Sequence, residues 1–130
     1  MEYQKQISEV LNPLNPFQIA LYGSRARGNF KKDSDYDIMV FWKSKNFPKS
    51  KIETEDEFCE KMYKLSEKLG NVLGASVDLV VMKYTGKWEY SIEEQDITFY
   101  ESVRTEAIYF KSTGGNELID MSKKIGLFKT

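Results

Sequence analysis

Two aspartates at alternate positions, Asp35 and Asp37, stand at the start of a strand-like apolar run that continues to Trp42. Side chains i and i+2 of a strand project from the same face, so these carboxylates would lie side by side. Two like charges that close repel each other unless a cation lies between them. Because Mg²⁺ binds carboxylate oxygens together with substrate phosphates, the pair predicts a magnesium site at the start of the strand.

A second apolar run, residues 17–22, ends directly before Gly23 and Ser24. Glycine allows the backbone to approach a ligand closely, and a serine hydroxyl followed by arginines offers donors to phosphate oxygens. The segment therefore predicts a phosphate-binding site beside the metal site. Its candidate residues are Gly23, Ser24, Arg25 and Arg27.

Residues 23–38, which read GSRARGNFKKDSDYDI, resemble the nucleotidyltransferase signature of the DNA polymerase β superfamily. The GSRARG and SDYD segments are similar to the GSxARG and SDxD motifs of its minimal nucleotidyltransferase (MNT) branch. That family has a third carboxylate on a later strand, and Asp78 in the apolar run SVDLVV matches it. With Asp78 included, the resemblance extends over most of the chain.

The resemblance implies a nucleotidyltransferase that moves a nucleoside monophosphate, AMP from ATP in the leading hypothesis, to an acceptor hydroxyl and releases pyrophosphate. It implies two Mg²⁺ ions held by Asp35 and Asp37, with Asp78 binding the ion on the acceptor side and taking part in deprotonating the hydroxyl. Gly23 and Ser24 would hold the β- and γ-phosphates. One of the two arginines that follow would neutralise charge there, and the sequence does not select between them.

Two rival motif interpretations fail. Glycines at positions 23 and 28 have the spacing of a Walker A loop, but Asn29-Phe30 replaces the required Lys-Ser/Thr pair. The aspartates at 33, 35 and 37 resemble the start of an EF-hand loop, which requires glycine at its sixth position and glutamate at its twelfth. Ile38 and Ser44 stand there instead.

The composition excludes or disfavours several other kinds of site. The chain has 130 residues, 41% of them apolar, which suits one folded domain with a modest core. With no histidine and one cysteine, an internal disulfide and a Ser-His-Asp triad are excluded and a zinc site is disfavoured. The net charge of −1 does not favour a nucleic-acid partner. Because no signal-peptide pattern or long apolar run occurs, we expect a cytoplasmic protein without a membrane partner.

The apolar periodicity predicts both strands and helices. Thr54 and Glu57 have capping-box spacing at the start of a helix whose apolar stripe ends at Leu69, with Gly70 as its predicted stop. Together with the resemblance, this order predicts an α/β (α+β) fold: a small mixed β-sheet flanked by helices, as in polymerase β-like nucleotidyltransferases. The expected strands are 17–22, 35–42, 76–82 and 107–110, and the expected helices are 1–11, 53–69 and 92–105.

We expect residues 1–111 to form the minimal nucleotidyltransferase domain and residues 112–130 to form a C-terminal tail. A short helix in this tail would dock on the domain or on a partner, in an oligomer with a second copy or with another protein.

The identity of the acceptor is the open question. A domain of this size has little room for an acceptor-binding half, and the resemblance therefore implies a partner protein. Many MNT proteins resemble antitoxins that adenylylate a tyrosine of a HEPN-type ribonuclease toxin, and we take this role as the first hypothesis. One alternative is a non-catalytic MNT-like binding subunit. Another is a small-molecule nucleotidyltransferase of the aminoglycoside type, whose acceptor site would require a homodimer.

Overall fold

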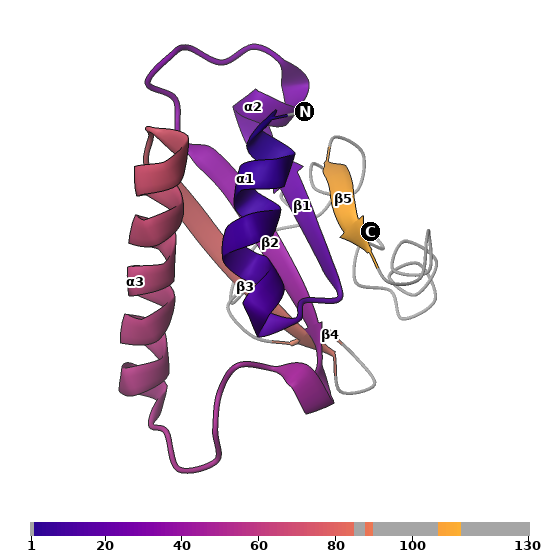
Figure 1. Ribbon diagram of the computed structural model, residues 1–130, viewed down its shortest axis with the longest axis vertical. Helices are drawn as coiled ribbons and strands as arrows, with labels where there is room; N and C mark the ends of the chain where they lie inside the picture. Colours follow the sequence, from indigo (N-terminus) through magenta and orange to yellow (C-terminus); the bar gives the residue numbers. More distant parts are fainter. Residues whose placement is uncertain (1, 85–87, 90–106, 113–130) are drawn as a thin grey trace.

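The computed structural model describes residues 2–84, 88–89 and 107–112 (Figure 1). The expected helix 92–105 and the tail after residue 112 lie outside the described residues. The described helices are α1 (Glu2–Leu11), η1 (Asn12–Leu14), α2 (Gly23–Arg27), η2 (Ser44–Asn46) and α3 (Glu55–Leu73), of which η1 and η2 are 3₁₀ helices. The strands are β1 (Gln18–Tyr22), β2 (Tyr36–Lys43), β3 (Val77–Tyr84), β4 (Trp88–Glu89) and β5 (Ile108–Ser112).

The strands form one mixed sheet in the order β4-β3-β2-β1-β5. The central strand β2 runs antiparallel to β1 and parallel to β3. Outside these, β5 pairs antiparallel with β1, and β4 pairs antiparallel with β3. Parallel neighbours need a long crossover connection, and α3 supplies it between β2 and β3. The predicted mixed sheet with flanking helices is confirmed, and β4 is a strand that the sequence did not predict.

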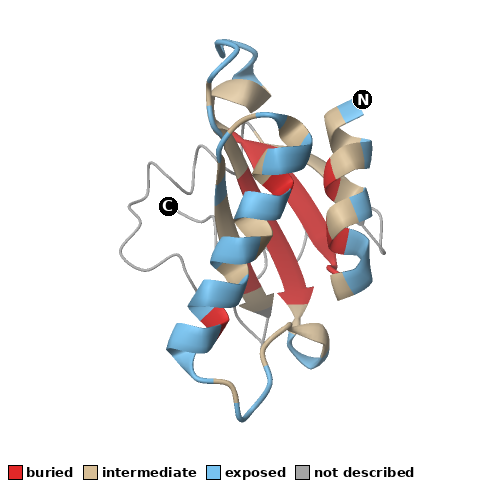
Figure 2. Cartoon of the chain, turned by 60° about the vertical axis from the view of Figure 1, so that its left-hand side comes forward, coloured by how far each residue is buried: buried red, intermediate tan, exposed pale blue. Residues whose placement is uncertain are grey.

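The core lies between the sheet and the helices α1 and α3, which cover the same face of the sheet (Figures 1 and 2). Residues 38–42 of β2 are completely buried, which is typical of the central strand of a sheet. Because side chains alternate along a strand, Asp37 and Asp78 project from the face opposite to the helices. The buried residues of the helix-covered core are Ile7, Leu11, Ile19, Leu21, Ile38, Val40, Trp42, Phe58, Leu69 and Val81.

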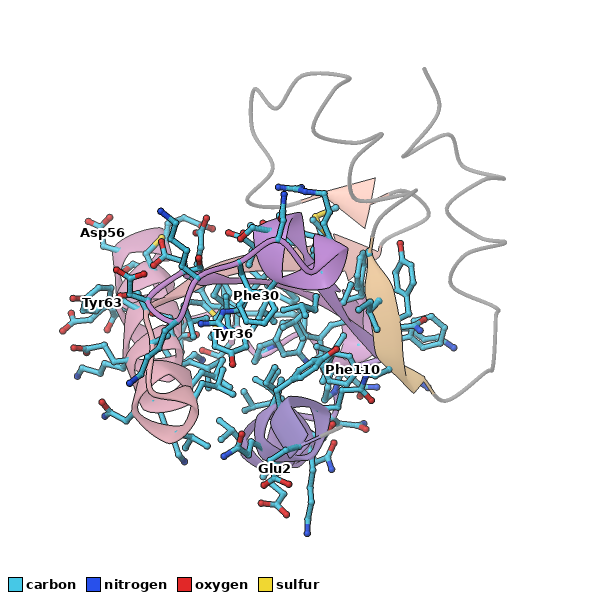
Figure 3. All side chains as sticks on the ribbon, turned by 90° about the horizontal axis from the view of Figure 1, so that it is seen from above. Glu2, Phe30, Tyr36, Asp56, Tyr63 and Phe110 are labelled. Atoms are coloured by element: carbon cyan, nitrogen blue, oxygen red, sulfur yellow. The ribbon has the colours of Figure 1, made fainter. Side chains whose placement is uncertain are left out.

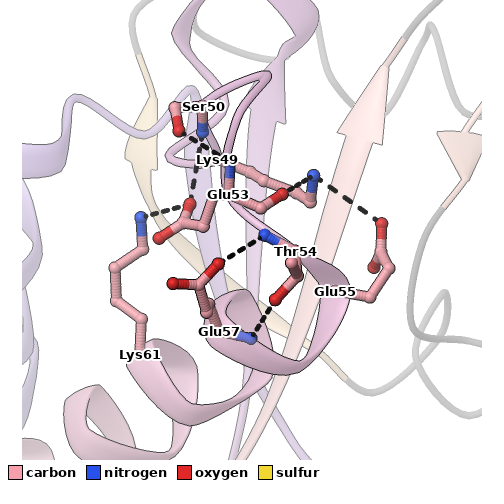
Figure 4. Close-up of polar contacts among 7 residues, drawn as sticks. All are labelled: Lys49, Ser50, Glu53, Thr54, Glu55, Glu57 and Lys61. Carbon is pink, nitrogen blue, oxygen red and sulfur yellow. Dashed lines mark hydrogen bonds and ion pairs between the residues drawn. The ribbon is translucent and has the colours of Figure 1, made fainter.

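The capping box predicted for the start of α3 is confirmed (Figure 4). The backbone N–H of Glu57 donates to Thr54 Oγ1 at 3.0 Å, and the backbone N–H of Thr54 donates to Glu57 Oε1 at 2.9 Å. Phe58 and Leu69, at the two ends of the predicted apolar stripe, are buried against the sheet. Within the described part of the chain, no helix combines the length and apolar character needed to cross a membrane.

The prediction that Gly70 ends this helix is wrong, because α3 continues through it to Leu73. Gly74 closes the helix instead: it has a φ of 75°, and its backbone N–H donates to the carbonyl of Gly70 at 2.8 Å. Gly70 has a different role, since a Cβ added there would lie 3.0 Å from the carbonyl oxygen of Ala75. The glycine allows the chain leaving the helix to pass close to it.

The strand boundaries differ from the prediction by one or two residues. β2 begins at Tyr36 rather than at residue 35, and β3 begins at Val77 and extends to Tyr84. The last predicted strand is confirmed as β5, which ends one residue beyond the expected domain boundary at 111. The shift in β2 leaves Asp35 just outside the strand, so that the sheet register does not by itself hold its backbone.

Gly74→Ala should lower the free energy of unfolding by about 1 kcal/mol and Tm by about 4 °C, because alanine is strained in the left-handed backbone region. No atom lies within 4 Å of the added Cβ, so the loss would come from backbone strain alone. Gly74→Asn is the control, because asparagine tolerates this conformation better. Thermal unfolding measures both variants, and an alanine variant as stable as the wild type would contradict the role of Gly74 as the helix stop.

Candidate active site

The sheet register brings Asp37 and Asp78 side by side. The two residues are Cα partners in the parallel pairing of β2 with β3, so their side chains project from the same face. On the other side of β2, Tyr22 is the antiparallel partner of Asp37. Asp37 is half-buried, whereas Asp78 and the neighbouring Asp35 are exposed. Backbone pairing therefore brings two of the three predicted carboxylates together, and the third, Asp35, lies directly before the first residue of β2.

Negative charge accumulates where β2 and β3 begin. We call this end of the two strands, with Asp35, Asp37 and Asp78, the acidic edge. The pKa of Asp37 is raised to about 6 by burial, then by the charges of Asp78 and Asp35, and the positive charge of Arg27 partly opposes the rise. Burial also raises the pKa of the Tyr22 phenol, and the charges of Asp78 and Asp37 add to the effect. A cation that neutralised this edge would favour the ionised carboxylates.

The donor set fits a hard divalent ion, since three carboxylates supply oxygen ligands of the kind that Mg²⁺ prefers. Among the described residues, no group of three or more acidic, histidine or cysteine side chains is already assembled around a common point. The assignment of Asp35, Asp37 and Asp78 as magnesium ligands stays a prediction.

Gly23 packs directly against the acidic edge. It has a φ of 73°, and a Cβ added to it would overlap Oδ2 of Asp37. Both the backbone conformation and the space beside the carboxylate therefore require glycine at this position. The sequence suggested close approach of a ligand as the reason for this glycine, and the structure adds contact with Asp37.

Ser24 lies in the first turn of the short helix α2. The helix ends at Gly28, whose φ is 84° and whose backbone N–H donates to the carbonyl of Ser24 at 3.0 Å. The Ser24 side chain is half-buried and follows directly on the glycine that contacts Asp37. Its role in binding phosphate stays a prediction.

The two arginines of α2 have different environments, because residues two positions apart on a helix do not face the same side. The Arg25 guanidinium donates to backbone carbonyls of the loop that follows α2 and lies over the rings of Phe30 and Tyr36. Figure 3 shows these two rings next to each other. Arg27 is exposed, and its charge lowers the pKa of Asp37. Of the two, Arg27 is the arginine coupled to the acidic edge.

Sequence reasoning missed the positions of Tyr22 and Arg25 in this arrangement. In the sequence Tyr22 is only a strand residue, because its pairing with Asp37 is visible only once the register of β1 and β2 is known. The sequence alone does not distinguish Arg25 from Arg27 as a candidate phosphate ligand. Aromatic residues at 30 and 36 were the available signal for its stacking, but their distance from Arg25 depends on how the loop folds back.

A groove of about 370 Å³ runs between α3 and β3 and reaches the acidic edge. Asp78 lines it together with apolar side chains that include Phe58, Met62 and Leu79. A neighbouring pocket of about 440 Å³ shares Tyr63, Ser66 and Val77 with it, so the two lie next to each other. The groove lies on the face of the sheet that α3 covers, whereas the Asp78 side chain projects from the opposite face, so Asp78 only borders it.

Comparison with known proteins finds similarity over most of the chain. The family model described as "Polymerase beta, Nucleotidyltransferase" matches residues 5–105. MJ1379 of Methanocaldococcus jannaschii, a proposed protein adenylyltransferase, is 42% identical over 65 residues, which are 50% of this chain and 56% of that protein. The chain thus matches little more than half the length of this curated relative.

Two solved structures have similar folds. A chain from the crystal structure of a toxin–antitoxin with AMP-PNP has a TM-score of 0.62 at 22% identity, covering 97% of this chain and 86% of that one. A chain from the complex of tri-AMPylated Shewanella oneidensis HEPN toxin with MNT antitoxin has a TM-score of 0.56 at 20% identity, covering 98% and 85%. At these identities the likeness establishes a shared fold.

Without divalent cations, Asp37→Asn should stabilise the protein at pH 8. The raised folded-state pKa of about 6 means that this carboxyl favours folding most at low pH, and that the contribution is lost as the pH rises through 6. After allowance for solvent screening of this half-exposed group, the gain is about 1 kcal/mol, and it should shrink at pH 4.

Thermal unfolding in a chelator at both pH values measures this effect. Asp33→Asn is the matched control, because Asp33 is exposed and lies before the strand. Equal Tm values for the Asp37→Asn variant and the wild type at pH 8 would contradict an electrostatic cost at the site.

Proposed function

The chain belongs to the polymerase beta nucleotidyltransferase family, and from that premise we propose that it transfers AMP from ATP to a hydroxyl group of a partner protein. The observation that carries this proposal is the in-register pair of Asp37 and Asp78, with Gly23 packed against the first of them. This arrangement joins the predicted phosphate segment to the predicted metal ligands. The proposed adenylyltransferase activity of MJ1379 and the AMP-PNP bound in a structural neighbour support AMP and ATP as the transferred group and its donor.

The acidic edge would hold Mg²⁺ through Asp35, Asp37 and Asp78. When bound, the ions would supply positive charge that stabilises the charge developing on the transferred phosphoryl group. Asp37 is the central ligand of this proposal because it is half-buried between neighbouring strands, pairs in register with Asp78, and has a pKa that the charges of both Asp78 and Asp35 raise. Its raised pKa means that the proton must leave before the carboxylate can bind a metal ion.

The nucleotide phosphates would lie along the start of α2. The Ser24 hydroxyl and the backbone after Gly23 would donate hydrogen bonds to phosphate oxygens. Arg27 would supply the positive charge, because it is exposed and electrostatically coupled to Asp37. Arg25 is the weaker candidate, because its guanidinium is already held by backbone carbonyls.

The acceptor would approach along the groove between α3 and β3. Its apolar lining suits an aromatic side chain, and Asp78, which borders the groove, would accept the proton of a tyrosine hydroxyl. In the reaction, the acceptor oxygen forms a bond with the α-phosphorus. The bond between the α-phosphorus and the oxygen that bridges it to the β-phosphorus breaks, and pyrophosphate leaves with that oxygen. The HEPN toxin bound to an MNT antitoxin in a structural neighbour supports a HEPN-type toxin as the partner and an antitoxin role for this chain.

Asp37→Asn should reduce AMP transfer at least a hundredfold, because it removes the central ligand of the proposed metal site. The measurement is transfer of label from α-labelled ATP, with Mg²⁺, into a lysate of the source organism. Asp33→Asn changes the same kind of side chain outside the site and should leave transfer unchanged. We expect a labelled protein band with the wild type and with the Asp33→Asn variant, and no such band with the Asp37→Asn variant.

Other outcomes of this experiment point to the alternatives. Label that enters only small molecules would contradict a protein acceptor and favour the aminoglycoside type of transfer. A wild type that binds ATP but transfers no label to any protein, even with a purified HEPN-type partner, would favour a non-catalytic binding subunit.

Asp78→Asn should separate binding from chemistry. Because Asp78 is proposed to act on the acceptor side, this variant should bind ATP within about threefold of the wild type while AMP transfer falls at least a hundredfold. Calorimetric titration with AMP-PNP and Mg²⁺ measures the first quantity, and label transfer measures the second. Equal losses of binding and transfer would contradict an acceptor-side role for Asp78.

A further inference from the structure

The loop between α2 and β2 is organised around the side chain of Arg25. Its Nε donates to the carbonyl of Ser34 at 3.1 Å, and its Nη2 donates to the carbonyls of Ser34 at 2.9 Å and Lys32 at 3.1 Å. The guanidinium carbon lies 4.5 Å from the ring centroid of Phe30 and 4.0 Å from that of Tyr36. One side chain therefore links α2 to both ends of the loop and to the first residue of β2.

The loop has further internal hydrogen bonds that depend on the same segment. The backbone N–H of Ser34 donates to the carbonyl of Lys31 at 3.0 Å, and the backbone N–H of Lys31 donates to Ser34 Oγ at 2.8 Å. At its start, the N–H of Asn29 donates to the carbonyl of Ser24 at 3.2 Å. These bonds make a tight turn, and Arg25 holds that turn against α2.

Asp35 lies between the two groups that Arg25 holds. The carbonyl of Ser34 comes directly before it, and the ring of Tyr36 comes directly after it. Tyr36 is tied in turn to the neighbouring segment, since its backbone N–H donates to the carbonyl of Ser76 at 2.9 Å. Because Asp35 itself is exposed and precedes β2, its backbone position depends on these flanking contacts more than on the sheet.

We propose that Arg25 is a positioning residue that fixes Asp35 relative to Asp37, so that the two carboxylates can share a divalent cation. This inference rests on the proposed function, and it gives the two arginines of the GSRARG segment different roles. A guanidinium can donate to two carbonyls and stack between two rings at once, which no other side chain reproduces. Those contacts occupy the Nε and Nη2 donors, which form one of the edges that a guanidinium offers to a phosphate.

The test compares Arg25→Gln with Arg27→Gln, which each remove one positive charge from the same short helix. Binding of AMP-PNP is measured by calorimetry over a series of Mg²⁺ concentrations. Arg25→Gln should raise the Mg²⁺ concentration for half-maximal binding about tenfold and leave the affinity at saturating Mg²⁺ within about twofold. Arg27→Gln should instead lower the affinity at saturating Mg²⁺ about tenfold.

A second variant separates positioning from charge. Phe30→Ala removes one of the stacked rings without changing any charge, and the exposure of Phe30 makes the substitution compatible with folding. It should shift the Mg²⁺ dependence in the same direction as Arg25→Gln, by about threefold. Phe30→Tyr keeps the ring and should behave as the wild type. In both Arg25→Gln and Phe30→Ala, amide hydrogen exchange over residues 29–36 should become faster, which can be measured without ligand.

The outcomes distinguish this inference from the proposed function. A wild type that binds no AMP-PNP at any Mg²⁺ concentration would overturn both. If the wild type binds, an Arg25→Gln variant with lower affinity but unchanged Mg²⁺ dependence would make Arg25 a phosphate ligand and overturn this inference alone. The inference would also be overturned if amide hydrogen exchange over residues 29–36 were as slow in the Arg25→Gln variant as in the wild type.

Discussion

The in-register parallel pairing of β2 with β3 is the constraint on which the candidate site depends. It places Asp78 beside Asp37, although the two residues lie in separate segments of the chain. Parallel strands need a crossover, and α3 provides one whose ends are set by a capping box at Thr54 and a left-handed glycine at Gly74. On the other side of β2, the antiparallel partner β1 brings Tyr22 and then Gly23 to the same carboxylate.

This arrangement has an electrostatic cost in the absence of a cation. Burial and two neighbouring carboxylates raise the pKa of Asp37 to about 6, which means that its ionised form is disfavoured in the fold. A structure selected only for stability would not place Asp37, Asp78 and the buried phenol of Tyr22 at one sheet edge. Unfavourable charge that a divalent ion would relieve is typical of a site built for binding or catalysis.

The two arginines of α2 illustrate how one motif can serve two purposes. They are two positions apart on a short helix and so face different sides. Arg25 contacts the loop that leads to Asp35, whereas Arg27 is exposed and acts on Asp37 through its charge. Residues 23–27, the predicted phosphate-binding segment, are thereby connected to the acidic strand β2 three times: through Gly23, through the Arg25 loop contacts and through the charge of Arg27.

The sequence by itself determined the features that depend on neighbours along the chain. Alternating or continuous apolar runs predicted β1, β2, β3 and β5, and Thr54 with Glu57 predicted the start of α3, because strand periodicity and helix capping are local. Only the tertiary structure decided which backbones face one another. The contact of Gly23 with Asp37, the alignment of Asp37 with Asp78, the partners of Arg25 and the role of Gly70 beside Ala75 each require two distant segments to meet. A local pattern cannot encode such distances, which is why the acidic residue types were predictable and the geometry that relates them was not.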